Sequence, residues 1–270
     1  MQNKIVEMYN KRPKLWIVKL LLTFIILFII VLSSNGIEFK GITEKGSEVA
    51  LGIFHGLLHP DQSYLFSTGV DKVPYLILQT ISIAILGTIF GAIIALPFSF
   101  LSSPKIVGKY IAKIFTSIVL LIRTIPALVW ALVWIRVTGP GPFCGVVTQT
   151  ICSIGMITKM YVTAIEDLDT GVLESLDACG LNGIQKIRYG IIPQLSASFI
   201  STTIYRFDIN LKDATTLGIV GAGGIGAPLI QAIDGRRWSI VGAFLSGLIL
   251  LVLIIEYFST KIRTKLARGN

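Results

Sequence analysis

The sequence predicts an all-α membrane protein with six transmembrane helices and both termini in the cytoplasm. Hydrophobic residues make up 53% of the 270 residues and charged residues only 14%, with a mean hydropathy of +0.76, which is typical of bilayer proteins. Apolar runs of roughly 18 residues or more recur along the chain, long enough to cross a membrane. Basic residues gather at the ends of these runs, so the net charge of +9 does not indicate a nucleic-acid partner.

The first 73 residues are predicted to hold one transmembrane helix and a segment on the extracytoplasmic surface. Four basic residues between positions 4 and 14 precede the apolar run Leu15–Leu32, and no small-residue cleavage site follows it. We therefore expect an uncleaved transmembrane helix rather than a signal peptide. Residues 33–73 are the longest polar stretch, and within them residues 49–58 favour one face loosely. This pattern suits a short helix that lies on the membrane surface.

Histidine and cysteine positions predict no metal site and no disulfide framework. His55 and His59 are four residues apart and Asp61 follows, a spacing that zinc sites can use. However, Pro60 ends the helix at once and no second pair of ligands exists. The chain has three cysteines, Cys144, Cys152 and Cys179. They form no CxxC pair, so neither a metal cluster nor a disulfide pattern follows from them.

Residues 74–270 are predicted to form the core of the protein, and its first three spans differ in character. The span at 74–101 carries Gly87 and Gly91, which give a flat strip for another helix. The span at 114–137 is interrupted by Arg123-Thr-Ile-Pro126. Because an arginine is expensive inside a bilayer, we expect Arg123 near the cytoplasmic side. The span at 143–164 is rich in small and weakly polar residues, so other helices must largely enclose it.

The fifth apolar segment begins at Leu195, and the sixth covers residues 239–258. The fifth carries five polar side chains where it should cross lipid, Arg206, Asp208, Asn210, Lys212 and Asp213. At about 100° per residue, Asp208 and Lys212 share one face in the order that favours an ion pair, and the other three share roughly the opposite face. Two interpretations stay open. The set is an internal ion-pair network that braces the helix, or one face lines a water-filled passage for an anion, with Arg206 as its main residue.

A glycine-rich run, Gly221-Ala-Gly-Gly-Ile-Gly226, follows the fifth segment and matches the dinucleotide-binding pattern G-x-G-x-x-G. That pattern binds nucleotides only after a buried strand, within a soluble βαβ unit. Neither is available between two membrane spans. We therefore expect these glycines to mark close packing or a backbone break near the outer surface, without nucleotide binding.

The distribution of basic residues sets the expected orientation. With both termini inside, the cytoplasmic segments hold 14 Lys and Arg residues and the outside segments hold five. This excess fits the positive-inside rule. It places the polar loop at residues 166–193 in the cytoplasm.

That loop, between the fourth and fifth spans, has a distinctive spacing. Glu174 is followed six residues later by Gly180 and, thirteen after that, by Pro193 behind the aliphatic Ile192. Glycine permits the left-handed backbone of a sharp turn, and proline starts the next helix without losing a hydrogen bond. The spacing resembles the cytoplasmic coupling loop of ABC-transporter permeases. The resemblance implies contact with a separate ATPase through Glu174, Asp177, Ala178, Gly180, Ile192 and Pro193.

The loop departs from the family pattern at three positions. Ser175 and Leu176 stand where two alanines are usual, and Gly190 stands where isoleucine is preferred. Tight docking of the ATPase is therefore in question at these points.

Several further segments resemble the permease subunit of phosphonate-type ABC importers. They are Tyr205-Arg-Phe-Asp208, Ala214-Thr215, Gly218–Gly226, Arg123-Thr-Ile-Pro-Ala-Leu-Val-Trp130 and Gly139-Pro-Gly-Pro-Phe143. The resemblance implies a type I ABC importer-like permease of six helices, acting as a homodimer in the cell membrane. It further implies two cytoplasmic ATP-binding subunits and an extracytoplasmic protein that delivers phosphonate, phosphite or phosphate. The chain has no P-loop, so ATP and Mg²⁺ are expected on the partner ATPase and no cofactor on this chain.

Two other classes compete with this interpretation. A secondary transporter driven by an ion gradient would use Asp208, Asp213 and the glycine break, but it predicts inverted repeats, and the two halves show none. A membrane enzyme would need a nucleophile, a base and an orienting acid at one depth, and these do not occur together. The sequence leaves open which phosphorus oxyanion is carried and whether the permease pair is a homodimer or a heterodimer.

Overall fold

The computed structural model describes residues 15–36 and 45–268, which form helices joined by short turns, with no strand in these two ranges. Backbone contacts divide the chain into two compact units, Met1–Glu48 and Val49–Asn270. In the first unit, α2 (Trp16–Asn35) confirms the helix predicted at residues 15–32. The basic residues at positions 4–14 and the acidic Glu38 and Glu44 lie outside the described residues. The predicted domain division after residue 73 stays a prediction.

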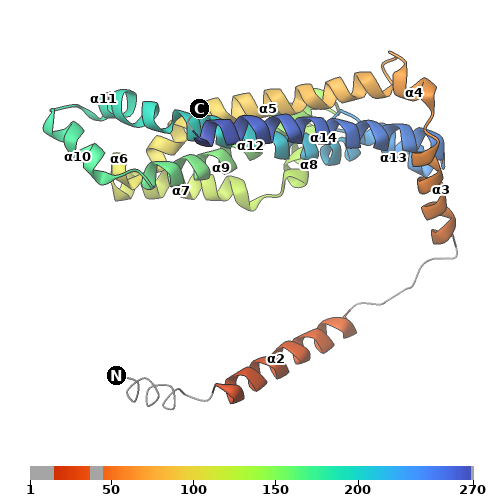
Figure 1. Ribbon diagram of the computed structural model, residues 1–270, viewed down its shortest axis with the longest axis horizontal. Coiled ribbons are helices and arrows are strands. Elements are labelled where there is room, and N and C mark those ends of the chain that lie inside the picture. Colours follow the sequence, from red (N-terminus) through yellow and green to blue (C-terminus); the bar gives the residue numbers. More distant parts are fainter. Residues whose placement is uncertain (1–14, 37–44, 269–270) are drawn as a thin grey trace. The chain divides into compact units, whose positions relative to one another are not determined.

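The second unit is a bundle of long helices with shorter ones at its ends (Figure 1). In chain order its helices are α3 (Gly46–Leu58, whose first three residues belong to the first unit), α4 (Gln62–Phe66), α5 (Val73–Ser102), α6 (Pro104–Val107), α7 (Lys109–Thr124), α8 (Ala127–Thr138), α9 (Pro142–Glu166), α10 (Thr170–Ala178), α11 (Gly183–Lys186), the π-helical turn η1 (Ile187–Ile191), α12 (Ile192–Ile219), α13 (Gly226–Asp234) and α14 (Trp238–Arg268). α10 and α11 lie at one end of the bundle, and α4 and α13 lie at the other (Figure 1).

Four described helices, α2, α5, α9 and α14, are long and apolar enough to cross a membrane. The expected single span at residues 114–137 is instead two helices, α7 and α8, bent by 86° at the break before Ala127. Pro126 explains the break, because proline cannot continue the hydrogen-bond ladder of α7. α12 is 28 residues long, but it carries Arg206, Asp208, Lys212 and Asp213 and is not one of these four helices. The count of six spans and the cytoplasmic termini therefore stay predictions.

The glycine strip of α5 packs against α9, as predicted. A side chain at Gly87 would overlap the Cβ atom of Gln149, and one at Gly91 would overlap that of Ser153. Much of α9 is buried by α5, α7, α8 and α12, which agrees with the expectation that this helix is enclosed. The close approach of α5 and α9 brings the polar side chains of α9 between α5 and α12.

The glycine-rich run forms a backbone break between α12 and α13, as expected. Gly221, Gly223 and Gly224 adopt φ values of +95°, +84° and +76°, a left-handed backbone that favours glycine. Two side chains of α5 bind the turn, since Gln79 accepts from the Gly224 N–H at 2.7 Å and Thr80 accepts from the Ile225 N–H at 3.1 Å. The run therefore serves as packing in this fold.

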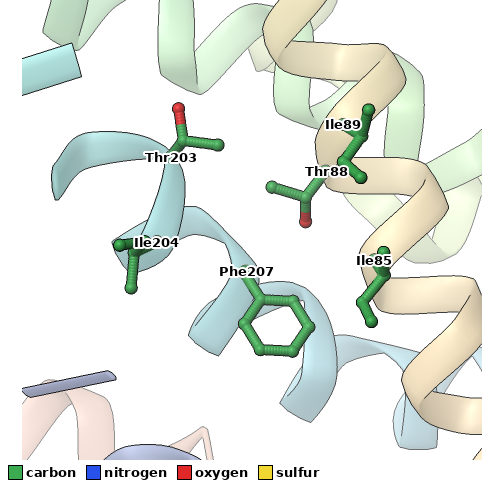
Figure 2. Close-up of a pocket in the computed structure, with 6 residues that line it drawn as sticks. All are labelled: Ile85, Thr88, Ile89, Thr203, Ile204 and Phe207. Atoms are coloured by element: carbon green, nitrogen blue, oxygen red, sulfur yellow. The ribbon is translucent and has the colours of Figure 1, made fainter. Parts of the chain in front are cut away.

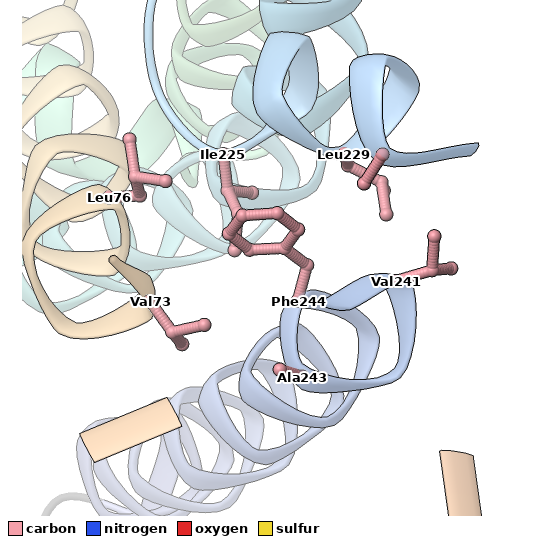
Figure 3. Packing of buried hydrophobic residues seen from close by; sticks show 8 residues of the cluster. Val73, Leu76, Ile225, Leu229, Val241, Ala243 and Phe244 are labelled. Atoms are coloured by element: carbon pink, nitrogen blue, oxygen red, sulfur yellow. The ribbon is translucent and has the colours of Figure 1, made fainter. Parts of the chain in front are cut away.

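An apolar cluster joins α5, α13 and α14 at the end of the bundle where α4 lies. It is built on Phe244, with Val73 and Leu76 from α5, and Ile225, Leu229 and Val241 around the ring (Figure 3). Each of these side chains is at most 8% exposed. This cluster fixes the end opposite to α10 and α11.

The segment between α3 and α4 holds no group of three metal-ligating side chains, and the same is true of the rest of the described chain. The rings of His55 and His59 stack with centroids 4.8 Å apart. Asp61 instead caps α4 by accepting hydrogen bonds from the N–H groups of Ser63 and Tyr64. The Ser63 hydroxyl also donates to this carboxylate, and it is the main cause that lowers the pKa of Asp61. The second half of α3 packs on the start of α14, where Gly56 meets the backbone of Trp238.

Candidate functional site

The loop predicted to contact an ATPase forms a compact helical hairpin. α10 ends in a Schellman motif, in which the Gly180 N–H donates to the Asp177 carbonyl at 2.9 Å and the Leu181 N–H donates to the Leu176 carbonyl at 3.3 Å. Gly180 has φ +72°, which confirms the left-handed backbone predicted there. A residue with a Cβ atom would be strained at this position.

Side-chain contacts hold α10 and α11 together. Asn182 and Gln185 form a capping box at the start of α11, with both hydrogen bonds at 2.9 Å. Lys186 of α11 forms an ion pair with Asp177 of α10. At the base of the loop, the Lys105 ammonium donates to the carbonyl of Glu166 at 2.5 Å and to a second carbonyl two residues on. A cation at the C-terminus of α9 complements its dipole, so the loop has a fixed root.

Two departures of the loop from the family pattern compensate for each other. The side chain of Leu176 lies over Gly190, so close that a Cβ atom at residue 190 would overlap its Cδ1 atom. The larger residue on α10 therefore occupies the space that a larger residue in η1 would take. This contact docks α10 on the start of the continuous helical segment that leads into α12.

The six residues predicted to contact an ATPase lie at the loop end of the bundle. Glu174, Asp177, Ala178 and Gly180 are exposed on and after α10, and Ile192 and Pro193 are exposed in the first turn of α12. Pro193 lies in a first turn, as predicted, but the helix does not start there, because η1 continues directly into α12.

One face of α12 contacts α14 through ion pairs. Asp208 accepts a hydrogen bond from Ser259 at 2.5 Å and pairs with Arg263 at 3.4 Å. Lys212 pairs with Glu256 at 3.4 Å. The predicted pairing of Asp208 with Lys212 is therefore wrong. The two residues share a face as predicted, but α14 supplies a closer partner for each.

The other face of α12 contacts α9 and α5 through a buried polar network. The Nε atom of Arg206 donates to the Ser153 hydroxyl at 3.1 Å, and its Nη1 atom contacts the Met156 sulfur at 3.1 Å. The Asn210 amide donates to Ser153 and to Thr88, both at 2.8 Å. Gln149 donates to the Asn210 backbone carbonyl at 2.7 Å. The sequence alone did not predict these partners from α5 and α9. The glycine strip of α5 was the available signal, because it indicates the close helix contact that brings them together.

Arg206 and Asp213 reach from this network into a cavity of about 310 Å³. Its walls are Ile122, Arg123, Ile125, Pro126, Ala127, Cys152, Met156, Arg206 and Asp213. The Arg206 guanidinium lies 3.8 Å from the Asp213 carboxylate, and the Arg206 side chain is only 7% exposed. Within the described residues the cavity thus holds two arginines and one carboxylate.

Arg123 lies in the last turn of α7 and is an exposed residue. α7 begins at Lys109, at the end of the bundle that carries the loop (Figure 1). With a rise of about 1.5 Å per residue, Arg123 is about 21 Å from that end. The chain bends by 86° between α7 and α8 just after this residue. The expected position of Arg123 near the cytoplasmic side stays a prediction.

A second hollow, between α5 and α12, has a different character (Figure 2). It measures about 220 Å³ and is lined by Ile85, Thr88, Ile89, Thr203, Ile204 and Phe207. No charged side chain lines it. Such a surface suits an apolar contact and offers no counter-charge to an anion.

These features describe a helical membrane protein with a charged cavity lined by residues of α7, α8, α9 and α12 and with an exposed helical hairpin at one end. The chain belongs to the family of binding-protein-dependent transport system inner membrane components, whose family model matches residues 87–263. It is therefore a multi-pass inner-membrane transport component. The matched residues include both the hairpin and the arginine cavity.

Individual relatives and a solved structure agree with the family. HtxC of Stutzerimonas stutzeri, named for a phosphite transport system, is 34% identical over 186 residues, which cover 68% of this chain and 66% of that protein. PhnE of Mycolicibacterium smegmatis, named a phosphate-import permease, is 30% identical over 221 residues, covering 80% of this chain and 40% of that protein. The chain thus spans only part of the length of these relatives. A chain of the MetNI methionine ABC transporter has a similar fold, with a TM-score of 0.61 and 24% identity over 70% of this chain and 94% of that one.

Proposed function

We propose that this protein is the permease subunit of an ATP-driven importer for a phosphorus oxyanion, namely phosphonate, phosphite or phosphate. One observation carries the proposal. A cationic cavity and an exposed hairpin at one end lie in the same matched segment, residues 87–263. Relatives named for phosphite and phosphate transport support the substrate class.

The partners follow from the proposed function. Two copies of the permease would carry two cytoplasmic ATP-binding subunits, which hold ATP and Mg²⁺, and an extracytoplasmic binding protein would deliver the anion. The ATP-binding subunits would grip the hairpin through Glu174, Asp177, Ala178, Gly180, Ile192 and Pro193. The Schellman motif, the capping box and the Asp177–Lys186 pair support this role. Contacts of this kind would let the hairpin transmit movement as one body.

The passage would follow the seam between α9 and α12. Arg206 of α12 and Met156 of α9 line the arginine cavity, and one helical turn nearer the hairpin, Thr202 and Met160 line a second cavity of about 380 Å³. The two cavities therefore succeed each other toward the loop end of the bundle. We assign Arg206, Asn210 and Asp213 to this passage. Asp208 and Lys212, which pair with α14, act as a brace.

Closure of the ATP-binding subunits would draw the two hairpins together and tip the bundle from inward-open to outward-open. Moving a two-state equilibrium from 1:99 to 99:1 takes about 5.5 kcal/mol of differential binding. Nucleotide-driven closure of two subunits is a sufficient source for this energy.

The test compares two glycines of the hairpin. Gly180→Pro should abolish ATP-dependent uptake of labelled phosphonate or phosphate, because proline requires φ near −65° and Gly180 has φ +72°. Glu174→Lys should also uncouple uptake. Gly183→Ala is the matched control, since a Cβ atom there meets nothing within 4 Å and its φ is not positive. All variants should reach the membrane in normal amount.

Normal uptake by both Gly180→Pro and Glu174→Lys would refute the coupling role. The competing secondary transporter is tested in the same vesicles. If uptake stops when the ion gradients are collapsed while ATP is maintained, the ATP-driven mechanism is wrong.

A further inference from the structure

The arginine cavity contains more positive than negative charge. Arg123 and Arg206 line it with a single carboxylate, Asp213, among the described residues. A brace would need only one arginine for that carboxylate. The second arginine, Arg123, is exposed and is therefore available to a negatively charged partner that is not part of the bundle.

Neither arginine is saturated by the protein. The Arg206 guanidinium has five N–H donors, and its contacts are Ser153, Met156 and a carboxylate at 3.8 Å, beyond hydrogen-bond distance. Arg123 forms no hydrogen bond or ion pair with any residue in the described part of the chain. Donors of both side chains are thus available to a ligand in the cavity.

The position of Arg123 is set by a glycine of α9. A Cβ atom at Gly155 would lie 2.6 Å from the Cγ atom of Arg123. The absence of a side chain at residue 155 therefore gives the stem of Arg123 a place to cross α9. Arg123 lines the cavity and is at the same time an exposed residue, so its side chain is accessible to a ligand that enters there.

The start of α8 adds a further positive contribution. Pro126 and Ala127, the first residues of this 12-residue helix, also line the cavity. The N–H groups of Ala127 and Leu128 meet no acceptor among the residues that the structure describes. Free N–H groups and the helix dipole at an N-terminus favour an anion.

We propose that Arg123, Arg206 and the N-terminus of α8 form a binding station for a tetrahedral phosphorus oxyanion within the passage. The identity of the anion rests on the proposed function. Planar guanidinium forks bind phosphoryl oxygens through paired hydrogen bonds, which explains the choice of two arginines. Asp213 acts as an internal competitor for Arg206. It keeps the affinity low enough for the anion to leave along the α9–α12 seam.

The test uses Cys152 as a reporter, because its thiol lines the same cavity. The full-length protein with Cys144→Ala and Cys179→Ala is placed in lipid nanodiscs. Modification of Cys152 is timed with an anionic reagent, sulfonatoethyl methanethiosulfonate, and with a cationic one, trimethylammonioethyl methanethiosulfonate. Relative to a free thiol, the anionic reagent should be favoured at least about tenfold, because a cationic cleft concentrates anions.

The variants assign the preference to the two arginines. Arg123→Gln and Arg206→Gln should each lower it, and Arg123→Lys should keep most of it. Arg136→Gln is the control, because this exposed arginine of α8 does not line the cavity. Inorganic phosphate and methylphosphonate should slow the anionic reagent, and chloride at equal ionic strength should not. Asp213→Asn should lower the phosphate concentration needed for this protection.

Two results would overturn the station: equal rates for the two reagents, or a preference that Arg123→Gln leaves unchanged. Protection by sulfate but by neither phosphorus oxyanion would overturn the substrate class. The assay needs no ATP, so its failure is separate from that of the proposed function. Phosphate protection without ATP-dependent uptake would reject the importer and leave the station intact.

Discussion

The two faces of α12 hold similar residues in opposite circumstances. On the α14 face, Asp208 and Lys212 each have an oppositely charged partner at 3.4 Å. On the α9 face, Arg206 is more deeply buried, yet its carboxylate partner Asp213 is 3.8 Å away, and a second arginine lines the same cavity.

From this comparison we propose that the two interpretations of the charged segment apply to different faces. A face in which charges are matched one to one braces a bundle, and removing one of these charges should lower the stability of the protein. A face in which cations exceed carboxylates around a cavity is poised for an external anion, and its removal should cost transport. Each prediction below separates these two consequences.

The largest expected effect comes from removing both charges on the cavity face. The double variant Arg206→Gln/Asp213→Asn loses one positive and one negative charge, so its net charge equals that of the parent. If these two residues only braced the bundle, uptake by the double variant would be close to normal. We expect phosphate uptake to stay about 100-fold below the parent, because two charge-assisted hydrogen bonds of about 1.5 kcal/mol each are lost. The measurement is ATP-dependent uptake per folded permease. Uptake near the parental value would assign this face to bracing.

Removing one charge on the α14 face should lower the stability of the protein. Asp208→Asn leaves Arg263 without its counter-charge, and its side chain is only 27% exposed. We expect a loss of about 3 kcal/mol, near the lower end for breaking a buried pair, seen as a lower unfolding midpoint in detergent. Uptake per folded molecule should change little.

Removing both partners on that face should repair the damage. Asp208 Oδ1 and Arg263 Nε are buried without a hydrogen-bond partner among the described residues. Asp208→Asn/Arg263→Gln should therefore be about as stable as the parent. A double variant that is less stable than Asp208→Asn would contradict the bracing role.

The smallest effect concerns the positioning of Arg206. Ser153 accepts from both Arg206 and Asn210, whereas Thr88 accepts from Asn210 alone. Ser153→Ala should lower uptake about tenfold, since one hydrogen bond to a charged group is worth about 1.5 kcal/mol. Thr88→Val should leave uptake nearly unchanged. Equal losses in the two variants would show that the network only supports packing.

The sequence predicted much of this fold because long apolar runs and glycine spacing are local signals. The helical segments, the α5 strip, the break at Gly221–Gly226 and the two faces of α12 could all be derived from local spacing. The partners on those faces could not. Asp208 meets Ser259 and Arg263, which lie more than 50 positions along the chain, so a tertiary contact overrides the nearer Lys212.

The position of Arg123 depends on a feature that the sequence only hints at. Pro126 predicts an interruption, but it predicts neither the 86° angle between α7 and α8 nor that Arg123 and Arg206 line one cavity. The contact by which Leu176 and Gly190 compensate for each other is a second feature that the sequence alone does not show. Considered alone, each departure from the family pattern predicts a weaker loop. Only the contact between the two residues shows that the hairpin is packed.

The most direct test compares two neutralised cations on opposite faces of α12. Arg206→Gln and Lys212→Gln remove the same charge from the same helix, and ATP-dependent phosphate uptake per folded permease is measured for both. The account predicts that uptake by Arg206→Gln is about 100-fold lower than by Lys212→Gln, because two charge-assisted contacts to the anion are lost. Equal losses in the two variants would contradict it, because the cavity face would then have no special role in carrying the anion.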